Sequence, residues 1–290
     1  MAISIAIPFY DAEEFLLDAI RSVFAQTFQD WELILIDDGS TDGSLELARS
    51  IKDPRVKVIS DGENKRLAAR LNEVAKIAKY DIIARMDADD LMLPKRIETQ
   101  FEILKNNPEL DIVTTGVFSV ANNLSLKGAR GESFENPSFR DIITKKVNVI
   151  HAAMLVKKSW YQRNCYDESL KIAQDYDLWV RSALKEDFKI KSIKDSLYIY
   201  REEGNVSLDK LLRAYKNERK MLFRYISPLS LFLIFKSYLK TIYVIYKNKR
   251  GGLHELLKRR NKTEIDLKQR ELYSEALKEI KLTRIPGLDN

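Results

Sequence analysis

Residues 33–40 read Leu33-Ile34-Leu35-Ile36-Asp37-Asp38-Gly39-Ser40, and they are the clearest indication of the fold class of this 290-residue chain. Its first four residues are all apolar, which indicates a short strand buried on both faces. The acidic and turn-forming residues after them mark the end of that strand. A helical stretch at about 45–51 follows, so the segment predicts a strand, a turn and a helix in succession.

Strands and helices continue to alternate on both sides of this segment. Asp11 has a side chain suited to cap the first helix. The predicted strands lie at 3–7, 56–59, 82–84, 188–193 and 197–200, and the predicted helices at about 12–23, 67–78 and 94–106. Such alternation predicts an α/β fold with a doubly wound, mostly parallel sheet and helices on both faces.

Acidic residues follow two of the predicted strands. Asp37-Asp38 comes after Ile36, and Asp87-Ala88-Asp89-Asp90 comes after Met86. For either segment alone, turn chemistry is the simpler explanation. Both segments together would place carboxylates at one edge of the sheet, where ligands bind, and carboxylates repel each other unless a cation is present. A divalent metal bound to a diphosphate would supply that cation, and the sequence has neither a Walker lysine loop nor a Gly-x-Gly-x-x-Gly motif.

Three segments together resemble the signature blocks of the glycosyltransferase family 2 proteins, which have the GT-A fold. They are Ile5-Ala6-Ile7-Pro8-Phe9-Tyr10-Asp11, Ile36-Asp37-Asp38-Gly39-Ser40 and Arg85-Met86-Asp87-Ala88-Asp89-Asp90. The resemblance covers about residues 1–207 and implies a GT-A catalytic domain, with a nucleotide-sugar half at about 1–115 and an acceptor half at about 116–207. It implies an inverting transfer from a nucleotide diphosphate sugar, with UDP preferred, to a hydroxyl of a saccharide acceptor.

The resemblance also implies roles for single residues of the nucleotide-sugar half. Pro8 and Tyr10 would flank the nucleotide base, and Asp38 would accept a hydrogen bond from it. Asp87 would lie near the ribose and the diphosphate. Asp89 would bind the metal cofactor, which would be Mn²⁺ or Mg²⁺.

Arg66 stands where many family members have glycine. An arginine at this position would contact the base or a phosphate of the nucleotide, and a solvated residue at the start of a helix is an equally good explanation. The resemblance therefore makes Arg66 a candidate nucleotide-binding residue and leaves both explanations open.

The acceptor half supplies the remaining candidates. In Gln174-Asp175-Tyr176-Asp177, Asp175 takes the position of the catalytic base that removes the proton of the acceptor hydroxyl. Without the resemblance, Asp175 would be assigned to the electrostatics of a helix N-terminus. The segment 200–207 resembles a loop that closes over the diphosphate, where Glu203 could complete the metal sphere and Arg201 could neutralise the leaving group. His151 is assigned no ligand role.

Positive charge is concentrated near the C-terminus. The net charge is +6, and residues 209–260 contain fourteen Lys or Arg against three acids. The apolar segment 226–246 is interrupted by Lys236 and Lys240, and each lysine would cost about 2.5–3.5 kcal/mol inside a bilayer. We therefore expect an amphipathic helix in the plane of an anionic membrane, with packing on the enzyme or in a homodimer as the alternative. Its expected apolar face is Leu231, Phe232, Ile234, Phe235, Leu239, Ile242 and Ile245, and its expected polar face is Ser230, Lys236, Ser237, Lys240, Thr241 and Lys247.

Two other functions remain open at this point. The basic region would suit a nucleic-acid-binding protein, but an acidic crevice would repel a phosphate backbone, so we expect no nucleic acid partner. A metal-dependent nucleotidyltransferase would also use carboxylates, yet no Gly-rich basic loop follows the first strand. The single cysteine, Cys165, indicates a reducing compartment. We expect a cytoplasmic enzyme, peripheral on the inner face of the cell membrane, that acts on a lipid-linked saccharide in surface-glycan assembly. Residues 208–290 would form a basic, amphipathic, helical C-terminal region whose removal spares nucleotide binding.

Overall fold

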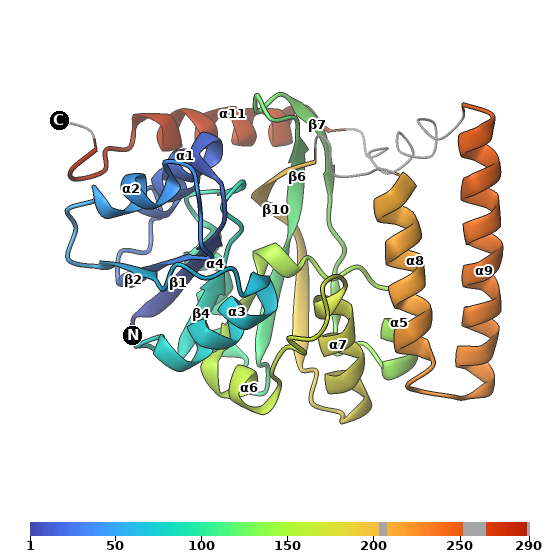
Figure 1. Cartoon of the computed structure of the whole chain (residues 1–290). Helices are drawn as coiled ribbons and strands as arrows, with labels where there is room; N and C mark the ends of the chain where they lie inside the picture. Colours follow the sequence, from blue (N-terminus) through green and yellow to red (C-terminus); the bar gives the residue numbers. More distant parts are fainter. Residues whose placement is uncertain (203–207, 252–264, 289–290) are drawn as a thin grey trace.

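The computed structural model describes residues 1–202, 208–251 and 265–288, and a single large sheet runs through their centre (Figure 1). The strand order is β3-β2-β1-β4-β9-β6-β10-β5, with β7 paired to β6 and β8 to β10. The strands are β1 (Ile3–Phe9), β2 (Trp31–Asp37), β3 (Val56–Ser60), β4 (Ile82–Arg85), β5 (Leu91–Met92), β6 (Ile112–Val120), β7 (Leu126–Arg130), β8 (Phe134–Glu135), β9 (Leu155–Lys157) and β10 (Ile190–Arg201). Strands β1 to β4 are mutually parallel, as are β6 and β10, while the shorter β5, β8 and β9 are antiparallel to their neighbours. The predicted α/β fold with a mostly parallel sheet is confirmed.

Helices cover both faces of this sheet, because successive side chains of a strand point to opposite sides. Ile5 and Ile7 of β1 pack with α1 on one face, whereas Ala6 packs with α3 on the other. The helices are α1 (Glu13–Phe24), α2 (Ser44–Arg49), α3 (Arg66–Ile77), α4 (Arg96–Asn106), α5 (Phe139–Ile143), α6 (Lys158–Arg163), α7 (Gln174–Leu184), α8 (Leu208–Leu222), α9 (Pro228–Lys249) and α11 (Leu267–Leu282), with a 3₁₀ turn at His151–Ala153. The sheet core is thus apolar on both sides, as the run Leu33-Ile34-Leu35-Ile36 predicted.

The acidic segments after β2 and β4 lie at the same edge of the sheet. Phe9 at the end of β1 pairs with Asp37 at the end of β2, and the Met86 N–H donates to the carbonyl of Ala6 (3.1 Å). Gly39 has φ of 78° and lies so close to Glu63 that a Cβ would sit 3.0 Å from the backbone carbon of that residue. A glycine is therefore required for the turn after β2.

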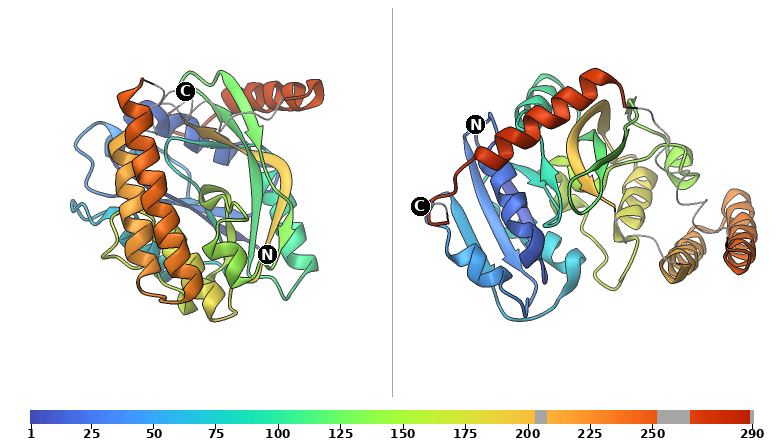
Figure 2. Two further views of the ribbon diagram at one scale, coloured as in Figure 1. Left: turned by 90° about the vertical axis from the view of Figure 1, so that its right-hand side faces the viewer. Right: turned by 90° about the horizontal axis from the view of Figure 1, so that it is seen from above.

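The C-terminal region is divided into two parts. Helices α8 and α9 form an antiparallel hairpin along one side of the molecule, with α9 outermost, whereas α11 runs along the top of the view in Figure 1, beside α1 (Figures 1 and 2). Tyr273 and Ile280 of α11 are buried against the sheet, and Ile285 beyond it joins the core around β1 and β2. Helix α11 and Ile285 after it are therefore packed onto the α/β body of the molecule.

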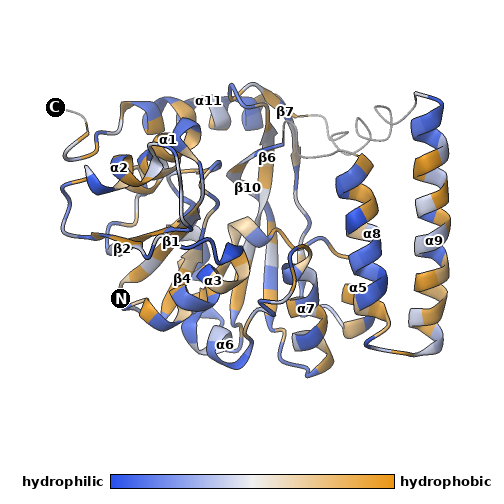
Figure 3. Cartoon of the chain, in the orientation of Figure 1, coloured by the Kyte–Doolittle hydropathy of each residue, from blue (hydrophilic) through white to orange (hydrophobic). Residues whose placement is uncertain are grey.

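The polarity of α9 is arranged differently from the expected amphipathic helix. Ser237 and Thr241 face α8, where they accept hydrogen bonds from Arg219 (3.2 and 2.9 Å). Lys236 and Lys240 remain exposed, so the expected polar face is split. The large exposed apolar residues of the helix are Leu231, Phe232, Phe235, Tyr238, Leu239, Ile242, Tyr243, Ile245 and Tyr246 (Figure 3). Among the described helices, only α9 is long and apolar enough to cross a membrane.

Candidate active site

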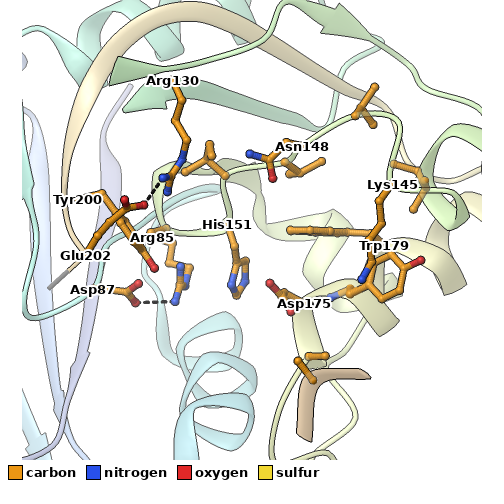
Figure 4. A pocket seen from close by; sticks show the side chains of 18 of the residues that line it. Arg85, Asp87, Arg130, Lys145, Asn148, His151, Asp175, Trp179, Tyr200 and Glu202 are labelled. Carbon is orange, nitrogen blue, oxygen red and sulfur yellow. Dashed lines mark hydrogen bonds and ion pairs between the residues drawn. The ribbon is translucent and has the colours of Figure 1, made fainter. Parts of the chain in front are cut away.

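A cavity of about 1090 Å³ lies beyond the end of β4, between the sheet and helices α5, α7 and α8 (Figure 4). Its lining includes Asp87, Asp89 and Asp175, which are separated by almost ninety residues in the chain. The α/β topology brings them together because the loop after β4 and the start of α7 both face this space. Three of the predicted site residues therefore share one cavity.

The loop after β4 forms a compact acidic cluster. Oxygen atoms of Asp87, Asp89 and Asp90 all lie within 4.8 Å of one another. Burial and the charge of Asp87 raise the pKa of Asp89, and burial together with Asp89 raises the pKa of Asp90 well above its ordinary value. Such repulsion is relieved by a bound cation, and a set of carboxylate oxygens suits a hard divalent ion such as Mg²⁺ or Mn²⁺. The donor set of this loop therefore fits the implied metal.

Arg201 supports this loop through its backbone N–H and its guanidinium. The Arg201 N–H donates to Asp90 Oδ1 (2.8 Å), and the Arg201 guanidinium donates to the Asp89 carbonyl, the Asn122 carbonyl and Asp18 Oδ2. Arg201 is 3% exposed and does not line the cavity. In this structure its guanidinium therefore holds the acidic loop, and the leaving-group contact expected for it stays a prediction. Glu203, the other ligand expected in this segment, lies outside the described residues.

Asp175 sits in the first turn of α7, at the cavity wall. Ala173 just before it has a left-handed backbone (φ 62°), which turns the chain into the helix. Burial raises the pKa of the Asp175 carboxyl. His151 lies beside Asp175 (Figure 4), and burial, followed by the charge of Arg85, keeps the pKa of this histidine well below its ordinary value. Asp175 is thus a carboxyl of raised pKa beside a histidine of lowered pKa, and its role as the catalytic base stays a prediction.

The predicted base-binding residues lie outside the cavity, at the adjoining edge of the sheet. Pro8 pairs with Ile36 near the ends of β1 and β2, and Tyr10 just beyond is 49% exposed. Asp38 accepts hydrogen bonds from the backbone N–H groups of Lys65 and Arg66. It also accepts one from Arg70 Nε (2.9 Å). Asp38 therefore ties β2 to α3, and a nucleotide base would be an additional partner of its carboxylate.

Arg66 has φ of 72°, a left-handed conformation that side-chain-bearing residues seldom adopt. This conformation gives a physical reason why glycine would suit the same position in related chains. The Arg66 N–H donates to Asp38, so the strained backbone serves the contact between the two segments. The site keeps an arginine here although glycine would relieve strain.

Several lining residues received no role from the sequence. Arg85 ends β4, is 2% exposed, and its Nη2 donates to Asp87 Oδ1 (2.5 Å). Two ion pairs cross the cavity wall, Lys145 with Glu218 of α8 (2.7 Å) and Arg130 with Glu202. A charged residue that ends a buried strand is a signal that could have singled out Arg85. The two ion pairs join distant segments, and no spacing in the sequence indicates them.

Comparison with known proteins identifies the family. Residues 4–165 match the model of Glycosyl transferase family 2. The chain belongs to this family. Over 234 residues it is 32% identical to a Bacillus subtilis (strain 168) protein named as a glycosyltransferase, EpsE, across 76% of this chain and 82% of EpsE. Family membership decides in favour of the enzyme over the nucleic-acid-binding protein and the nucleotidyltransferase.

Solved structures of glycosyltransferases share the fold of this family 2 chain. S. aureus TarS 1–349 in complex with UDP-GlcNAc superimposes with a TM-score of 0.61 at 15% identity, over 97% of this chain and 80% of that one. The mannosyltransferase PcManGT from Pyrobaculum calidifontis, in complex with GDP-Man and Mn²⁺, gives 0.59 at 13% identity, over 97% and 86%. The GT-A fold expected from the sequence is therefore confirmed.

Proposed function

We propose that this family 2 enzyme is a metal-dependent, inverting glycosyltransferase. It moves a hexosyl or N-acetylhexosaminyl group from a nucleotide diphosphate sugar to a hydroxyl of a saccharide acceptor. The observation that carries the proposal is that Asp175 shares one cavity with Asp87 and Asp89. A proton acceptor and an acidic loop suited to a divalent metal, on two walls of one cavity, would together serve a metal-assisted single displacement at an anomeric carbon.

The acidic loop and Asp175 would have separate roles in the transfer. Asp89, with Asp87 and Asp90 beside it, would hold the divalent ion, which neutralises charge on the leaving diphosphate when bound. Asp175 removes the proton of the acceptor hydroxyl as that oxygen attacks the anomeric carbon. Attack from the side opposite the leaving group inverts the anomeric configuration. The partly buried position of Asp175 limits the water that would compete with the acceptor.

The edge formed by Pro8, Tyr10 and Asp38 would hold the nucleotide base, with Arg66 beside it. A carboxylate that accepts an N3–H selects uracil or thymine, because cytosine has no such donor. UDP or dTDP is therefore the proposed nucleotide, with UDP preferred. The UDP-GlcNAc bound in the structurally similar TarS supports this choice.

Replacement of the base tests the proposal. Asp175→Asn should keep metal-dependent UDP binding and lose about 10²–10⁴-fold in turnover, which is the usual contribution of a general base. The matched control is Asp195→Asn, a change of the same type at an exposed position in β10, which should leave turnover unaltered. Proton NMR of the product should show the anomeric configuration opposite to that of the donor. A product with retained configuration would exclude a single displacement.

We further propose that the α8–α9 hairpin lays the enzyme on the anionic inner face of the cell membrane, where a lipid-linked saccharide presents its hydroxyl during surface-glycan assembly. Phe232, Phe235 and Ile242 point outward from α9 and are at least 60% exposed, and exposed lysines accompany them. The same hairpin contributes Ala214 and Glu218 to the cavity lining. A membrane against α9 would therefore lie next to the wall of the active site.

A further inference from the structure

The positively charged residues in the described lining of the cavity are all in ion pairs. Among the described residues that line it, three carry a positive charge: Arg85, Arg130 and Lys145. Each forms an ion pair with a carboxylate that also lines the cavity, respectively Asp87, Glu202 and Glu218. Two further lining carboxylates, Asp89 and Asp175, are in no ion pair with any described residue. The described part of the lining therefore offers a substrate no positively charged side chain that is not already in an ion pair.

Arg85 nevertheless has two donor nitrogens without hydrogen-bond partners among the described residues. Its Nη2 bonds to Asp87, while Nε and Nη1 are buried and have no hydrogen-bond partner among the described residues. The guanidinium lies between Asp87 and His151, and Asp175 follows beyond the histidine (Figure 4). Buried N–H groups without partners are unfavourable, so this position favours a ligand that brings oxygen acceptors. Because the charge of Arg85 is already matched by Asp87, uncharged oxygens suffice.

We propose that Arg85 determines the class of donor sugar. Its free N–H groups would donate hydrogen bonds to hydroxyl or acetamido oxygens of a neutral hexose, and the site would disfavour a hexuronate. This inference rests on the proposed glycosyl transfer, which places the sugar between the acidic loop and Asp175. Trp179, which also lines the cavity, supports this proposal, because its buried Nε1–H has no hydrogen-bond partner among the described residues. A hexuronate would bring a carboxylate close to Asp175, and the positively charged side chains among the described lining residues are already paired with carboxylates. Like charges placed together disfavour binding.

Calorimetry with four probes tests this inference on the full-length protein with Mn²⁺. The probes are UDP, UDP-glucose, UDP-N-acetylglucosamine and UDP-glucuronate. The wild type should bind at least one neutral sugar nucleotide more tightly than UDP, and UDP-glucuronate about tenfold or more weakly than UDP-glucose. Arg85→Lys keeps a charge for Asp87 but removes donors, so it should reduce the gain in affinity that the neutral sugar gives over UDP. The ratio between the two ligands isolates the sugar from any change in nucleotide binding.

Two variants release a positive charge in the cavity and leave Arg85 unchanged. Glu218→Gln frees Lys145, and Glu202→Gln frees Arg130, so at least one should narrow the preference for UDP-glucose over UDP-glucuronate. Equal or tighter binding of UDP-glucuronate by the wild type would overturn the inference and leave glycosyl transfer intact. If a folded Arg85→Lys variant shows the same gain in affinity for the neutral sugar nucleotide over UDP as the wild type, Arg85 does not bind the sugar. Absence of UDP binding in the presence of metal would instead count against the proposed nucleotide site.

Discussion

Reversing two charges on α9 should detach the enzyme from anionic membranes. Lys236 and Lys240 are exposed and one helical turn apart, so they form a row along one border of the outward apolar face. The double variant Lys236→Glu/Lys240→Glu leaves the apolar residues and the contacts with α8 in place. Any loss of binding can therefore be assigned to charge.

The size of the effect follows from the number of lysines. A basic residue at an anionic surface contributes about 1 kcal/mol, and its replacement by an acid turns attraction into repulsion of about the same size. Two reversals therefore change the binding free energy by about 4 kcal/mol, which is roughly a thousandfold in affinity at low salt. The Debye length falls from about 10 Å at 0.1 M salt to about 3 Å at 1 M, so the difference between wild type and variant should largely vanish at high salt.

Sedimentation with vesicles measures this. The vesicles contain phosphatidylcholine alone or with three parts in ten phosphatidylglycerol, and the matched control is Lys52→Glu/Lys57→Glu, two exposed lysines at the opposite, β3 end of the sheet. The control should bind like the wild type. If the wild type stays in the supernatant with anionic vesicles at low salt, or the α9 variant binds as tightly as the control, the membrane proposal is wrong. If the wild type is dimeric in solution and does not bind vesicles, the exposed apolar face of α9 packs against a second copy of the chain.

Three further predictions concern the catalytic body. The pKa of Asp175 is raised by burial, and only the ionised form accepts a proton, so turnover should fall on acidification at a higher pH than an ordinary aspartate would give; a pH–rate profile checks this. Asp89→Asn should abolish transfer and weaken Mn²⁺ binding, and excess chelator should do the same to the wild type; full activity in chelator would refute a metal requirement. Arg66→Gly should relieve about 1 kcal/mol of left-handed backbone strain and raise the melting temperature by about 2 °C, while weaker UDP binding would assign Arg66 to the nucleotide.

The nucleotide-sugar half could be predicted because its signals are local. Continuous apolar runs such as 33–36 must be buried on both faces, and residues directly after parallel strands must meet at one edge. The predicted strands 188–193 and 197–200 are instead one strand, β10, with irregular pairing to β6 at Ser196. A bulge adds a residue and breaks the alternation of side chains, so a continuous strand looks like two.

Contacts between distant segments could not be predicted. Asp11 was expected to cap α1, but Ala12 occupies the N-cap position, and Asp11 Oδ1 accepts from the Thr41 N–H (2.7 Å). The Ala12 N–H donates to Ser44 Oγ (2.8 Å), so the segment after β2 fixes the position of the loop before α1. Cavity pairs such as Lys145 with Glu218 have the same character, since each partner alone looks like an ordinary surface charge.

The contacts of the C-terminal region also decide how its function should be tested. Removal of residues 208–290 was expected to spare nucleotide binding. Arg224, in the turn after α8, bonds to Asp177 in the helix that carries Asp175 (3.2 Å), and Ile285 is fully buried in the core around β1 and β2. Truncation would expose that core and leave the buried carboxylate of Asp177 with one fewer partner, which destabilises the domain. Loss of activity in such a truncation would therefore say nothing about membranes, whereas charge reversal on the exposed border of α9 leaves these contacts intact.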